Sequence, residues 1–283
     1  MAAAPEAQGG GPIALVVSDV DGTLVTTDKR LSPASVDAVR SLREAGVRFS
    51  LISSRPPRGM AAVAKELEVV ETMAAFNGGT LFTPDLEPVE AHRLDAGAAR
   101  DALGLLAQRA VGVWVYADGT WRLTDPNGAH VDHERHTIGF DPVPVASFED
   151  VIGRIDKIVG VSDDHALLAR LREEMSDLLG PRAVVEQSQA YYLDVTHPQA
   201  DKGHGVQAIC ARLGVDLANT AVIGDMYNDV AMFRVAGFSV AMGQSPEAVK
   251  SMADAVSPSS NDEDGFARAV AQILLPRIRA CAG

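Results

Sequence analysis

Short apolar runs alternate with longer segments of helical period in the N-terminal part of the chain. The apolar runs are β-branched and as long as buried strands, and they lie at residues 13–17, 47–52 and 72–76. Segments of helical spacing fill the intervals, at residues 33–45 and 57–67, and Ser32-Pro33 is a suitable start for the first. The order strand, helix, strand, helix, strand predicts a parallel sheet with helices on both faces.

The same alternation returns near the C-terminus. Helical periods lie at residues 203–213, 228–235 and 262–275, and apolar runs typical of strands lie at 220–223, 238–242 and 253–257. We expect these elements to extend the first sheet into an α/β fold, a Rossmann-like doubly wound parallel sheet.

Residues 84–197 have a different pattern of apolar and polar positions. A helical segment at 96–109 precedes an aromatic hairpin at 113–123, and strand patterns at 157–161 and 191–195 flank a helical segment at 164–179. This mixture predicts an α+β insertion into the parallel domain. The expected organisation is a disordered tail at residues 1–11, a core made of 12–83 and 198–283, and the insertion at 84–197.

The composition is that of a globular protein with one or two domains. Of 283 residues, 47% are hydrophobic and 22% are charged, and 38 acidic against 25 basic residues give a net charge of −13. This charge argues against nucleic acid as a partner, because a polyanion requires a basic face. A small phosphorylated ligand remains compatible, since one metal ion and one or two cations in a pocket can neutralise it.

The chain lacks the marks of a membrane or secreted protein. No apolar run approaches the ~18 residues of a membrane span, and residues 1–12 have neither the basic start nor the apolar stretch of a signal peptide. Cys210 and Cys281 lie far apart and without metal-ligand spacing. We therefore expect a cytoplasmic protein with no membrane partner, and a monomer or homodimer.

Polar side chains follow the predicted parallel strands, where a doubly wound sheet binds its ligands. They are Asp19 and Asp21 after the first strand, Ser53 and Arg55 after the second, Asn77 and Gly78 after the third, and Asp225 and Asp229 after the strand at 220–223. Lys202 begins the helix before that last strand. We expect all of these side chains to face one crevice.

Several carboxylates in one crevice require a cation, because they repel each other and raise one another's pKa. Oxygen ligands suit Mg²⁺, which completes its octahedron with water and substrate phosphate. With Lys202 and Ser53 at the same point, the crevice could accept a phosphoryl group. Asp19 would then be placed to attack phosphorus, and Asp21 to protonate the leaving oxygen.

Four motifs in this order resemble those of the haloacid dehalogenase-like phosphohydrolases. They are Asp19-Val20-Asp21-Gly22-Thr23, Ser53, Lys202-Gly203 and Gly224-Asp225-Met226-Tyr227-Asn228-Asp229, and the resemblance spans residues 13–275. An insertion after the third strand resembles the second cap class of this superfamily. The Asn77-Gly78-Gly79 turn and the form of the fourth motif are most similar to its IIB branch, the Cof-like phosphatases of sugar phosphates and hydroxymethylpyrimidine phosphate.

The resemblance implies a magnesium-dependent phosphatase of a small phosphorylated metabolite, with a catalytic core and a cap that selects the substrate. Asp19 would be the nucleophile that forms an aspartyl-phosphate, and Asp21 the general acid and base. Ser53 and Lys202 would hold the phosphoryl oxygens. The implied Mg²⁺ ligands are Asp19, Asp21, Asp225 and Asp229, and the implied substrate contacts are Ser54, Arg55, Asn77, Gly78 and Asn228. The second motif reads Ser53-Ser54-Arg55 where relatives often have Thr-Gly-Arg, and Ser keeps the hydroxyl.

Two other functions remain open at this point. A phosphomutase or phosphotransferase of the same superfamily would differ only in the acceptor of the phosphoryl group. A non-catalytic phospho-metabolite sensor or a receiver-like module would also place Asp residues and a Lys on a parallel sheet. Asp21 and the large insertion count against a receiver, which needs neither.

Histidines and aromatic residues in the insertion have simpler interpretations than ligand binding. The run His130, His133 and His136 has no accompanying Cys and is expected to form a solvated loop rather than a zinc site. The aromatic residues Trp114, Tyr116 and Trp121 are expected to pack the sheet of the insertion. His197, just before Lys202, could line the pocket or serve as a hinge.

Overall fold

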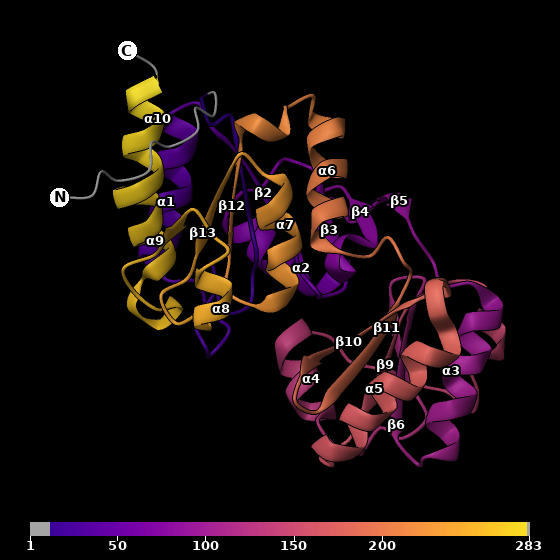
Figure 1. Ribbon diagram of the computed structural model, residues 1–283. Helices are drawn as coiled ribbons and strands as arrows, with labels where there is room; N and C mark the ends of the chain where they lie inside the picture. Colours follow the sequence, from indigo (N-terminus) through magenta and orange to yellow (C-terminus); the bar gives the residue numbers. More distant parts are fainter. Residues whose placement is uncertain (1–11, 282–283) are drawn as a thin grey trace. The chain divides into compact units, whose positions relative to one another are not determined.

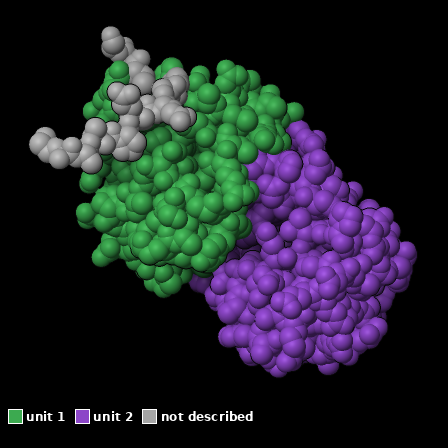
Figure 2. Space-filling model, viewed as in Figure 1, with its two compact units in different colours: residues 1–51, 206–283 green, residues 52–205 purple. Residues whose placement is uncertain are grey.

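The computed structural model describes residues 12–281, so the predicted tail at 1–11 lies outside the described residues. The chain forms two compact units, coloured separately in Figure 2. Unit 1 consists of Met1–Leu51 and Val206–Gly283, and unit 2 consists of Ile52–Gly205. Among residues 12–281, no helix has the length and apolar character needed to span a membrane.

A parallel five-stranded sheet forms the centre of unit 1. Its strands, in spatial order, are β14 (Ala255–Val256), β13 (Phe238–Ala241), β12 (Thr220–Gly224), β1 (Leu15–Ser18) and β2 (Arg48–Leu51). The inner strand β1 pairs with both of its neighbours, with Val17 opposite Val222 of β12 and Ser50 of β2. All four residues of β1 are buried, which explains why its sequence is a continuous apolar run rather than an alternating one. The predicted doubly wound α/β fold is confirmed.

Helices cover both faces of this sheet (Figure 1). They are α1 (Pro33–Glu44), α6 (Lys202–Leu213), which begins in unit 2, α7 (Val230–Val235), α8 (Glu247–Lys250), α9 (Gly265–Ala269) and α10 (Leu275–Cys281). A π-helical turn, Val270–Leu274, joins α9 to α10, so the helical segment continues beyond residue 275. Short 3₁₀ turns lie at Leu217–Asn219, Tyr227–Asp229 and Asn261–Glu263.

Helix α1 begins as the sequence predicts. The Ser32 side chain accepts a hydrogen bond from the Ser35 backbone N–H at 3.1 Å, and Pro33 occupies the first turn. The helix buries Val39 and Leu42 and packs against β2 and α9. Burial of each of these side chains is worth roughly 1.5–3 kcal/mol.

Unit 2 begins with a helix and a small antiparallel sheet. These are α2 (Pro57–Glu66), β3 (Met73–Ala75), a 3₁₀ turn at Phe76–Gly78, β4 (Thr80–Phe82) and β5 (Pro88–Ala91). The strand expected at residues 72–76 joins the parallel arrangement only through one isolated bridge, between Ile52 and Ala74. Its continuous partner is β4, in the antiparallel direction. Strands β4 and β5 were not predicted, because their short runs of mixed polarity show no clear period.

A six-stranded sheet forms the larger part of unit 2. Its strands, in spatial order, are β10 (Val184–Gln189), β11 (Tyr192–Thr196), β9 (Ile155–Val161), β6 (Gly112–Ala117), β7 (Thr120–Leu123) and β8 (Val143–Pro144). The helices α3 (Ala96–Gln108) and α5 (His165–Leu179) share an apolar core with one face of the sheet (Figure 1). Further 3₁₀ turns lie at Glu149–Val151 and Gly180–Arg182.

The histidine run forms a helix, so the prediction of a loop there was wrong. Helix α4 spans Val131–Ile138 and buries only its first and last residues, Val131 and Ile138. Two apolar positions are too few to give a helical period in the sequence. The helix is stabilised by tertiary packing, since α4 lies against α2 with Ile138 beside Gly59.

The compact units divide the chain at Leu51 and Val206, whereas the sequence predicts boundaries near residues 83 and 198. Residues 52–83 share contacts with the insertion: β4 pairs with β5, and the ring of Phe76 lies 5.7 Å from that of Tyr116. The role of residues 84–197 as a cap stays a prediction.

Candidate active site

Three buried carboxylates meet in unit 1. Asp19 follows β1, Asp225 follows β12, and Asp229 ends the 3₁₀ turn after β12. One oxygen from each lies within 4.8 Å of the others, and the residues are 4%, 8% and 0% exposed. The pairing of β1 with β12 produces this arrangement, because parallel neighbours end at the same edge, and the Asp19 N–H donates to the Ile223 carbonyl at 2.9 Å.

Asp229 shapes the turn that carries Asp225. Its Oδ2 accepts hydrogen bonds from the backbone N–H groups of Asp225 at 2.7 Å and Met226 at 2.8 Å. On the other side, the Thr23 hydroxyl donates to Asp225 Oδ1 at 3.5 Å. Gly22 has a φ of +76°, and a Cβ there would collide with the Asp225 carboxylate. A glycine is therefore required for the loop after β1 to approach Asp225.

Three hard oxygen donors at this spacing fit a divalent metal ion. Clustered carboxylates repel one another when ionised, and a hard cation relieves that repulsion. Within the described part of the chain, this is the only group of three or more potential metal ligands. The residues present therefore fit a metal site.

Asp21 is engaged in an ion pair that the sequence analysis did not anticipate. The Lys29 ammonium lies 2.7 Å from Asp21 Oδ1, and the two side chains are 24% and 26% exposed. Lys29 has a φ of +61°, and its N–H donates to the Thr26 carbonyl in a tight turn. The only sequence signal for this partner is a lysine in the loop between the first strand and Ser32.

Ser53 and Arg55 lie in unit 2, directly after β2. Ser53 is 1% exposed, and its hydroxyl accepts a hydrogen bond from the Arg55 N–H at 3.2 Å. The Ser53 N–H donates to the Ala74 carbonyl at 3.0 Å, which ties this loop to β3. The buried Arg55 guanidinium donates to the Gly59 carbonyl at 3.0 Å and so holds the first turn of α2. Ser54, between them, is half-buried.

Asn77 and Gly78 form a strained turn beside the start of α6. The Asn77 N–H donates to the Ser53 carbonyl at 2.8 Å, and both residues have positive φ, +56° and +98°. A Cβ on Gly78 would lie 2.6 Å from the Asp201 carbonyl oxygen, so only glycine permits this close approach. Lys202, the next residue, is 1% exposed.

The sequence-predicted residues thus fall into two described groups. Asp19, Asp21, Asp225, Asn228 and Asp229 belong to unit 1, and Ser53, Ser54, Arg55, Asn77, Gly78 and Lys202 to unit 2. That both groups surround one phosphoryl position stays a prediction. It is based on the common direction of the parallel strands, whose carboxyl ends lie at the same edge of a sheet.

A buried ion pair in the six-stranded sheet was missed by the sequence analysis. Lys157 Nζ of β9 lies 2.5 Å from Asp194 Oδ2 of β11, with side chains 10% and 5% exposed. Burial raises the pKa of the nearby carboxyl group of Glu186. The charges of Asp194 and Asp201 raise this pKa further, whereas those of Lys157 and Lys202 lower it. The available signal was a charged residue next to or within an apolar run: Lys157 directly precedes residues 158–161, and Asp194 lies between Leu193 and Val195.

Aromatic residues pack the same face of this sheet, as predicted. The rings of Trp114 and Trp121 lie 5.1 Å apart at 72°, and those of Tyr116 and Trp121 lie 6.4 Å apart. The Tyr116 hydroxyl donates a hydrogen bond to the Glu134 carboxylate at 2.6 Å. Burial raises the pKa of Tyr116, and the charge of Glu134 raises it further. His130 has a structural role, since it stacks on Tyr191 at 3.9 Å and bonds Asp163.

His197 also lies in a structural environment. Its ring stacks on His92 at 5.2 Å, and its Nδ1 accepts the Gln199 N–H at 3.1 Å. Burial lowers the pKa of His197, and the nearby His92 lowers it further by charge repulsion. This stack joins the chain leaving β5 to the chain leaving β11.

Comparison with known proteins places this arrangement in a family. The family model of the haloacid dehalogenase-like hydrolases matches residues 16–270. A haloacid dehalogenase-like hydrolase from Bacteroides thetaiotaomicron has a similar structure, with a TM-score of 0.84 and 26% identity over 92% of this chain and 99% of that chain. The subclass IIB sugar phosphatase BT4131 has a TM-score of 0.79 and 21% identity, covering 91% and 97%. The 5-amino-6-(5-phospho-D-ribitylamino)uracil phosphatase YcsE of Bacillus subtilis is 25% identical, covering 93% of this chain and 96% of the relative.

The chain belongs to the haloacid dehalogenase-like hydrolases. It is a phosphoric monoester hydrolase, and its resemblance to the Cof-like, IIB branch is confirmed.

Proposed function

We propose that the chain is a magnesium-dependent phosphatase that hydrolyses a small phosphorylated metabolite through an aspartyl-phosphate. The convergence of the buried carboxylates Asp19, Asp225 and Asp229 is the observation that carries this proposal. Like charges brought so close favour a divalent cation, and a cation beside a nucleophilic carboxylate suits attack on a phosphate ester.

Asp19 and Asp225 would hold Mg²⁺ through their carboxylates, with Asp229 as a further ligand or as support. Asp229 already uses Oδ2 for two backbone N–H groups, so Oδ1 is the oxygen that could reach the ion. When bound, Mg²⁺ neutralises charge on the phosphoryl oxygens.

The first step would be attack of an Asp19 oxygen on phosphorus. The new O–P bond forms as the bond to the leaving oxygen breaks, and Asp21 donates its proton to that oxygen. In the second step Asp21, now ionised, accepts a proton from water. The resulting hydroxyl attacks phosphorus, the bond to Asp19 breaks, and inorganic phosphate leaves. The Lys29 ion pair stabilises the ionised Asp21 that this second step requires.

Lys202 and Ser53 would hold the phosphoryl oxygens in both steps. A buried ammonium strengthens its interaction with an anion, because little water screens it. The backbone bond from Asn77 to Ser53 keeps this loop in place. Ser54, Arg55, Gly78 and Asn228 stay proposed substrate contacts.

We expect specificity to come from residues 84–197, and a hydroxyl-bearing substrate to be preferred. Glu186 is within electrostatic reach of Lys202, and Asp194 and Lys157 adjoin it. The Glu186 carboxylate can accept hydrogen bonds from hydroxyl groups of a substrate. The relative YcsE acts on a ribityl phosphate, which is consistent with this chemistry.

The test is an assay of the purified chain against a panel of phosphorylated metabolites, with Mg²⁺ and with EDTA. We expect phosphate release that depends on Mg²⁺ and is fastest for polyol or sugar phosphates. Transfer of the phosphoryl group to an added alcohol in preference to water would support the phosphotransferase alternative. Binding without turnover would support the sensor and contradict this proposal.

Point variants test specificity better than removal of residues 84–197. Deletion would break the pairing of β4 with β5 and expose Phe76 and Gly59, which lie against Tyr116 and Ile138. Glu186→Gln keeps the shape of a side chain near Lys202 and removes its charge. We expect it to raise KM for the best natural substrate and to leave hydrolysis of p-nitrophenyl phosphate unchanged, and an unchanged ranking of substrates would contradict the role.

A further inference from the structure

The loop between β1 and α1 carries the proposed general acid and base, Asp21, and folds back on itself. Residues 25–31 form a short hairpin, whose first and last residues are joined by an antiparallel bridge. Within it the Thr26 N–H donates to the Arg30 carbonyl at 2.9 Å, and the Lys29 N–H donates to the Thr26 carbonyl at 2.8 Å. Lys29 pairs with Asp21 from this hairpin. The position of the hairpin therefore decides where the Lys29 ammonium meets Asp21.

Asp262 holds the hairpin from a segment far along the chain. Its Oδ1 accepts a hydrogen bond from the Thr27 N–H at 2.8 Å, and its Oδ2 accepts one from the Thr27 hydroxyl at 2.7 Å. Both bonds lower the pKa of the Asp262 carboxyl group, and the backbone bond contributes more. A carboxylate that uses both oxygens on one residue fixes the backbone and the side chain of that residue together.

Two further side chains hold the start of the same loop. The Gln244 side chain donates to the Gly22 carbonyl at 2.5 Å and accepts the Asn261 N–H at 3.2 Å. The Asn261 side chain donates to the Val25 carbonyl at 3.0 Å. Gln244 lies in the segment after β13, and Asn261 in the segment after β14. With Thr27, three positions of the loop are therefore held from outside it.

The order of the strands explains why these contacts lie beside the carboxylate cluster. In the parallel sheet β12 lies between β1 and β13, and Asp225 follows β12. The segments after these strands leave the same edge of the sheet, so the loop after β1 passes the end of β12 to reach those after β13 and β14. Gly22, which approaches the Asp225 carboxylate closely, lies in this part of the loop.

The segments that hold the loop are themselves joined by hydrogen bonds. The Gly243 N–H donates to the Ser259 carbonyl at 3.1 Å, which connects the segment after β13 with the segment after β14. The Gly265 N–H donates to the Ser260 carbonyl at 2.8 Å. Asp262 lies between these two bonded residues and so belongs to a closed turn, which gives the hairpin a fixed point of attachment.

We propose that Asp262, together with Gln244, is a positioning residue for the general acid and base Asp21. Asp262 fixes Thr27, the hairpin then presents Lys29 to Asp21, and Gln244 fixes the residue next to Asp21. This inference rests on the proposed phosphatase reaction. A proton donor acts only within hydrogen-bond reach of the leaving oxygen, and a displacement of about 1 Å can lower a rate as much as ~100-fold.

The choice of ester distinguishes this role from a purely structural one. An alkyl phosphate releases a strongly basic alkoxide, which requires a proton from Asp21, whereas p-nitrophenolate leaves readily without one. The ratio kcat/KM reports the steps that include loss of the leaving group. A displaced Asp21 therefore slows alkyl esters selectively, whereas a smaller folded fraction lowers the activity on both esters by the same factor.

The test compares kcat/KM of the full chain with Mg²⁺ for two esters. One is p-nitrophenyl phosphate, and the other is the alkyl ester hydrolysed fastest by the wild type among glucose 6-phosphate, ribose 5-phosphate and glycerol 3-phosphate. Asp262→Ala should lower kcat/KM about tenfold for the alkyl ester and less than about threefold for p-nitrophenyl phosphate. Gln244→Ala removes the bond to Gly22 and should show the same selectivity with a smaller loss.

Two more variants test whether Asp262 acts through Asp21. Asp262→Asn keeps an acceptor for the Thr27 N–H and a donor for its hydroxyl, so it should restore most of the activity on the alkyl ester. In the background of Asp21→Asn, Asp262→Ala should cause no further loss, because no acid remains to be positioned. A further loss in that background would contradict the inference.

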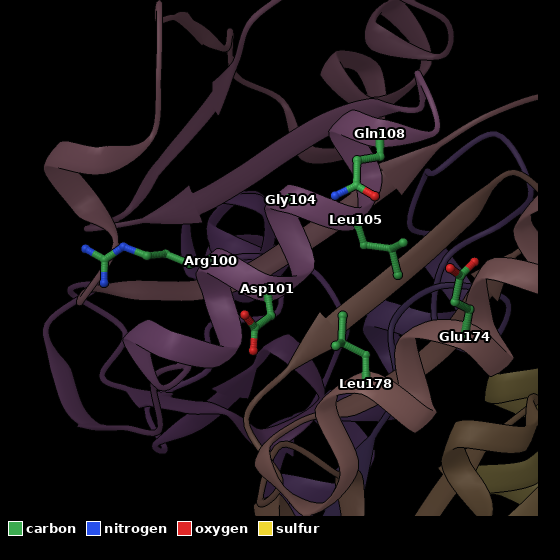
Figure 3. Close-up of a pocket in the computed structure, with 7 residues that line it drawn as sticks. All are labelled: Arg100, Asp101, Gly104, Leu105, Gln108, Glu174 and Leu178. Atoms are coloured by element: carbon green, nitrogen blue, oxygen red, sulfur yellow. The ribbon is translucent and has the colours of Figure 1, made fainter.

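Asp101 provides a matched control in unit 2. It lines a hollow between α3 and α5 (Figure 3), and its carboxylate accepts a hydrogen bond from Arg182 at 2.8 Å. Like Asp262, it is an exposed carboxylate that joins segments far apart in the chain. No residue proposed for catalysis, phosphate binding or metal binding lines this hollow. Asp101→Ala should therefore leave kcat/KM unchanged for both esters.

The outcomes separate this inference from the proposed function. Equal losses for both esters in Asp262→Ala, accompanied by a lower melting temperature, would assign the residue a structural role and overturn the inference. Wild-type kcat/KM for both esters in Asp262→Ala would overturn it as well and leave the phosphatase proposal intact. A wild type that releases phosphate from none of the esters would instead overturn the proposed function, and this inference with it.

Discussion

The two units bury charge in opposite ways. Unit 1 gathers three carboxylates, Asp19, Asp225 and Asp229, within 4.8 Å of one another. Unit 2 buries an opposite pair, Lys157 and Asp194, at 2.5 Å. The first arrangement concentrates like charge and is favourable only with a cation from elsewhere, whereas the second neutralises itself.

This difference distinguishes a cluster that binds a ligand or takes part in a reaction from an ion pair that only stabilises the fold. A cluster that requires an external cation is unstable as a structural device, so its presence indicates a reaction or a ligand. The Lys157–Asp194 pair neutralises itself, needs no ion from outside and acts within the fold. Substitutions in unit 1 should therefore change activity more than stability, and those at Lys157 or Asp194 should change stability.

The largest expected effect is that of Asp19→Asn. We expect loss of at least ~10⁴-fold in turnover, since the amide cannot form the acyl-phosphate bond. The melting temperature should be unchanged or higher, because one of three crowded charges is removed. Wild-type turnover in this variant, assayed with p-nitrophenyl phosphate and Mg²⁺, would show that the nucleophile is elsewhere.

Asp21→Asn should give a smaller loss of activity, again without unfolding. We expect kcat to fall ~10²–10⁴-fold, as is typical for a positioned acid or base, with little change in KM. The variant also breaks the ion pair with Lys29, whose side chains are a quarter exposed and contribute little to stability. An effect confined to KM would contradict the proton-transfer role.

In unit 2, Asp194→Ala should destabilise the fold by about 3 kcal/mol, because it leaves a buried ammonium without its partner. This is the lower end of the range for broken buried pairs, since Glu186 remains close to Lys157. Urea denaturation measures the free energy of unfolding. The contrast between the units would fail if this variant were as stable as the wild type.

Two controls sharpen that measurement. The double variant Lys157→Met, Asp194→Leu removes both charges and should recover most of the stability, because apolar side chains of similar volume often replace a buried pair without loss. Glu149→Ala breaks the exposed pair with Arg100, whose side chains are 67% and 54% exposed, and should change stability by about 0–1 kcal/mol.

The last expected effect is pH-dependent and concerns Asp156. Burial raises the pKa of Asp156 from 3.8 to about 6; Arg93 opposes this rise and Asp118 adds to it. The folded state thus holds the proton more tightly, so stability falls as the pH rises from about 4 to 6 and stays lower above that. A shift of about two pKa units corresponds to about 3 kcal/mol, and Asp156→Asn should gain up to that amount at pH 7.5 and almost nothing at pH 4. Equal gains at both pH values would contradict the burial of an ionised carboxylate as the cause.

Regular periods explain which elements could be predicted from the sequence. Strands β1, β2, β12 and β13 and helices α1, α2, α3 and α5 lie where apolar runs or helical spacing predicted them. The short strands β4, β5 and β10 and helix α4 were not predicted. Strand β4 has only three residues, and β5, β10 and α4 bury too few residues to show a period. Because parallel strands run in the same direction, the sequence alone predicted that Asp19 and Asp225 lie at the same edge of the sheet.

The α/β fold, the family and the motif residues follow from the amino-acid sequence, because they depend on local periods and on the residue types at strand ends. Tertiary structure alone decided the partners of these residues: Lys29 for Asp21, Asp194 for Lys157, and the 3₁₀ turn in which Asp229 holds the amides of Asp225 and Met226. It also placed the Arg58 guanidinium over the ring of Phe140. The physical reason is that hydrogen bonds and ion pairs join groups far apart in the chain, whereas periodicity reports only which face of an element is buried.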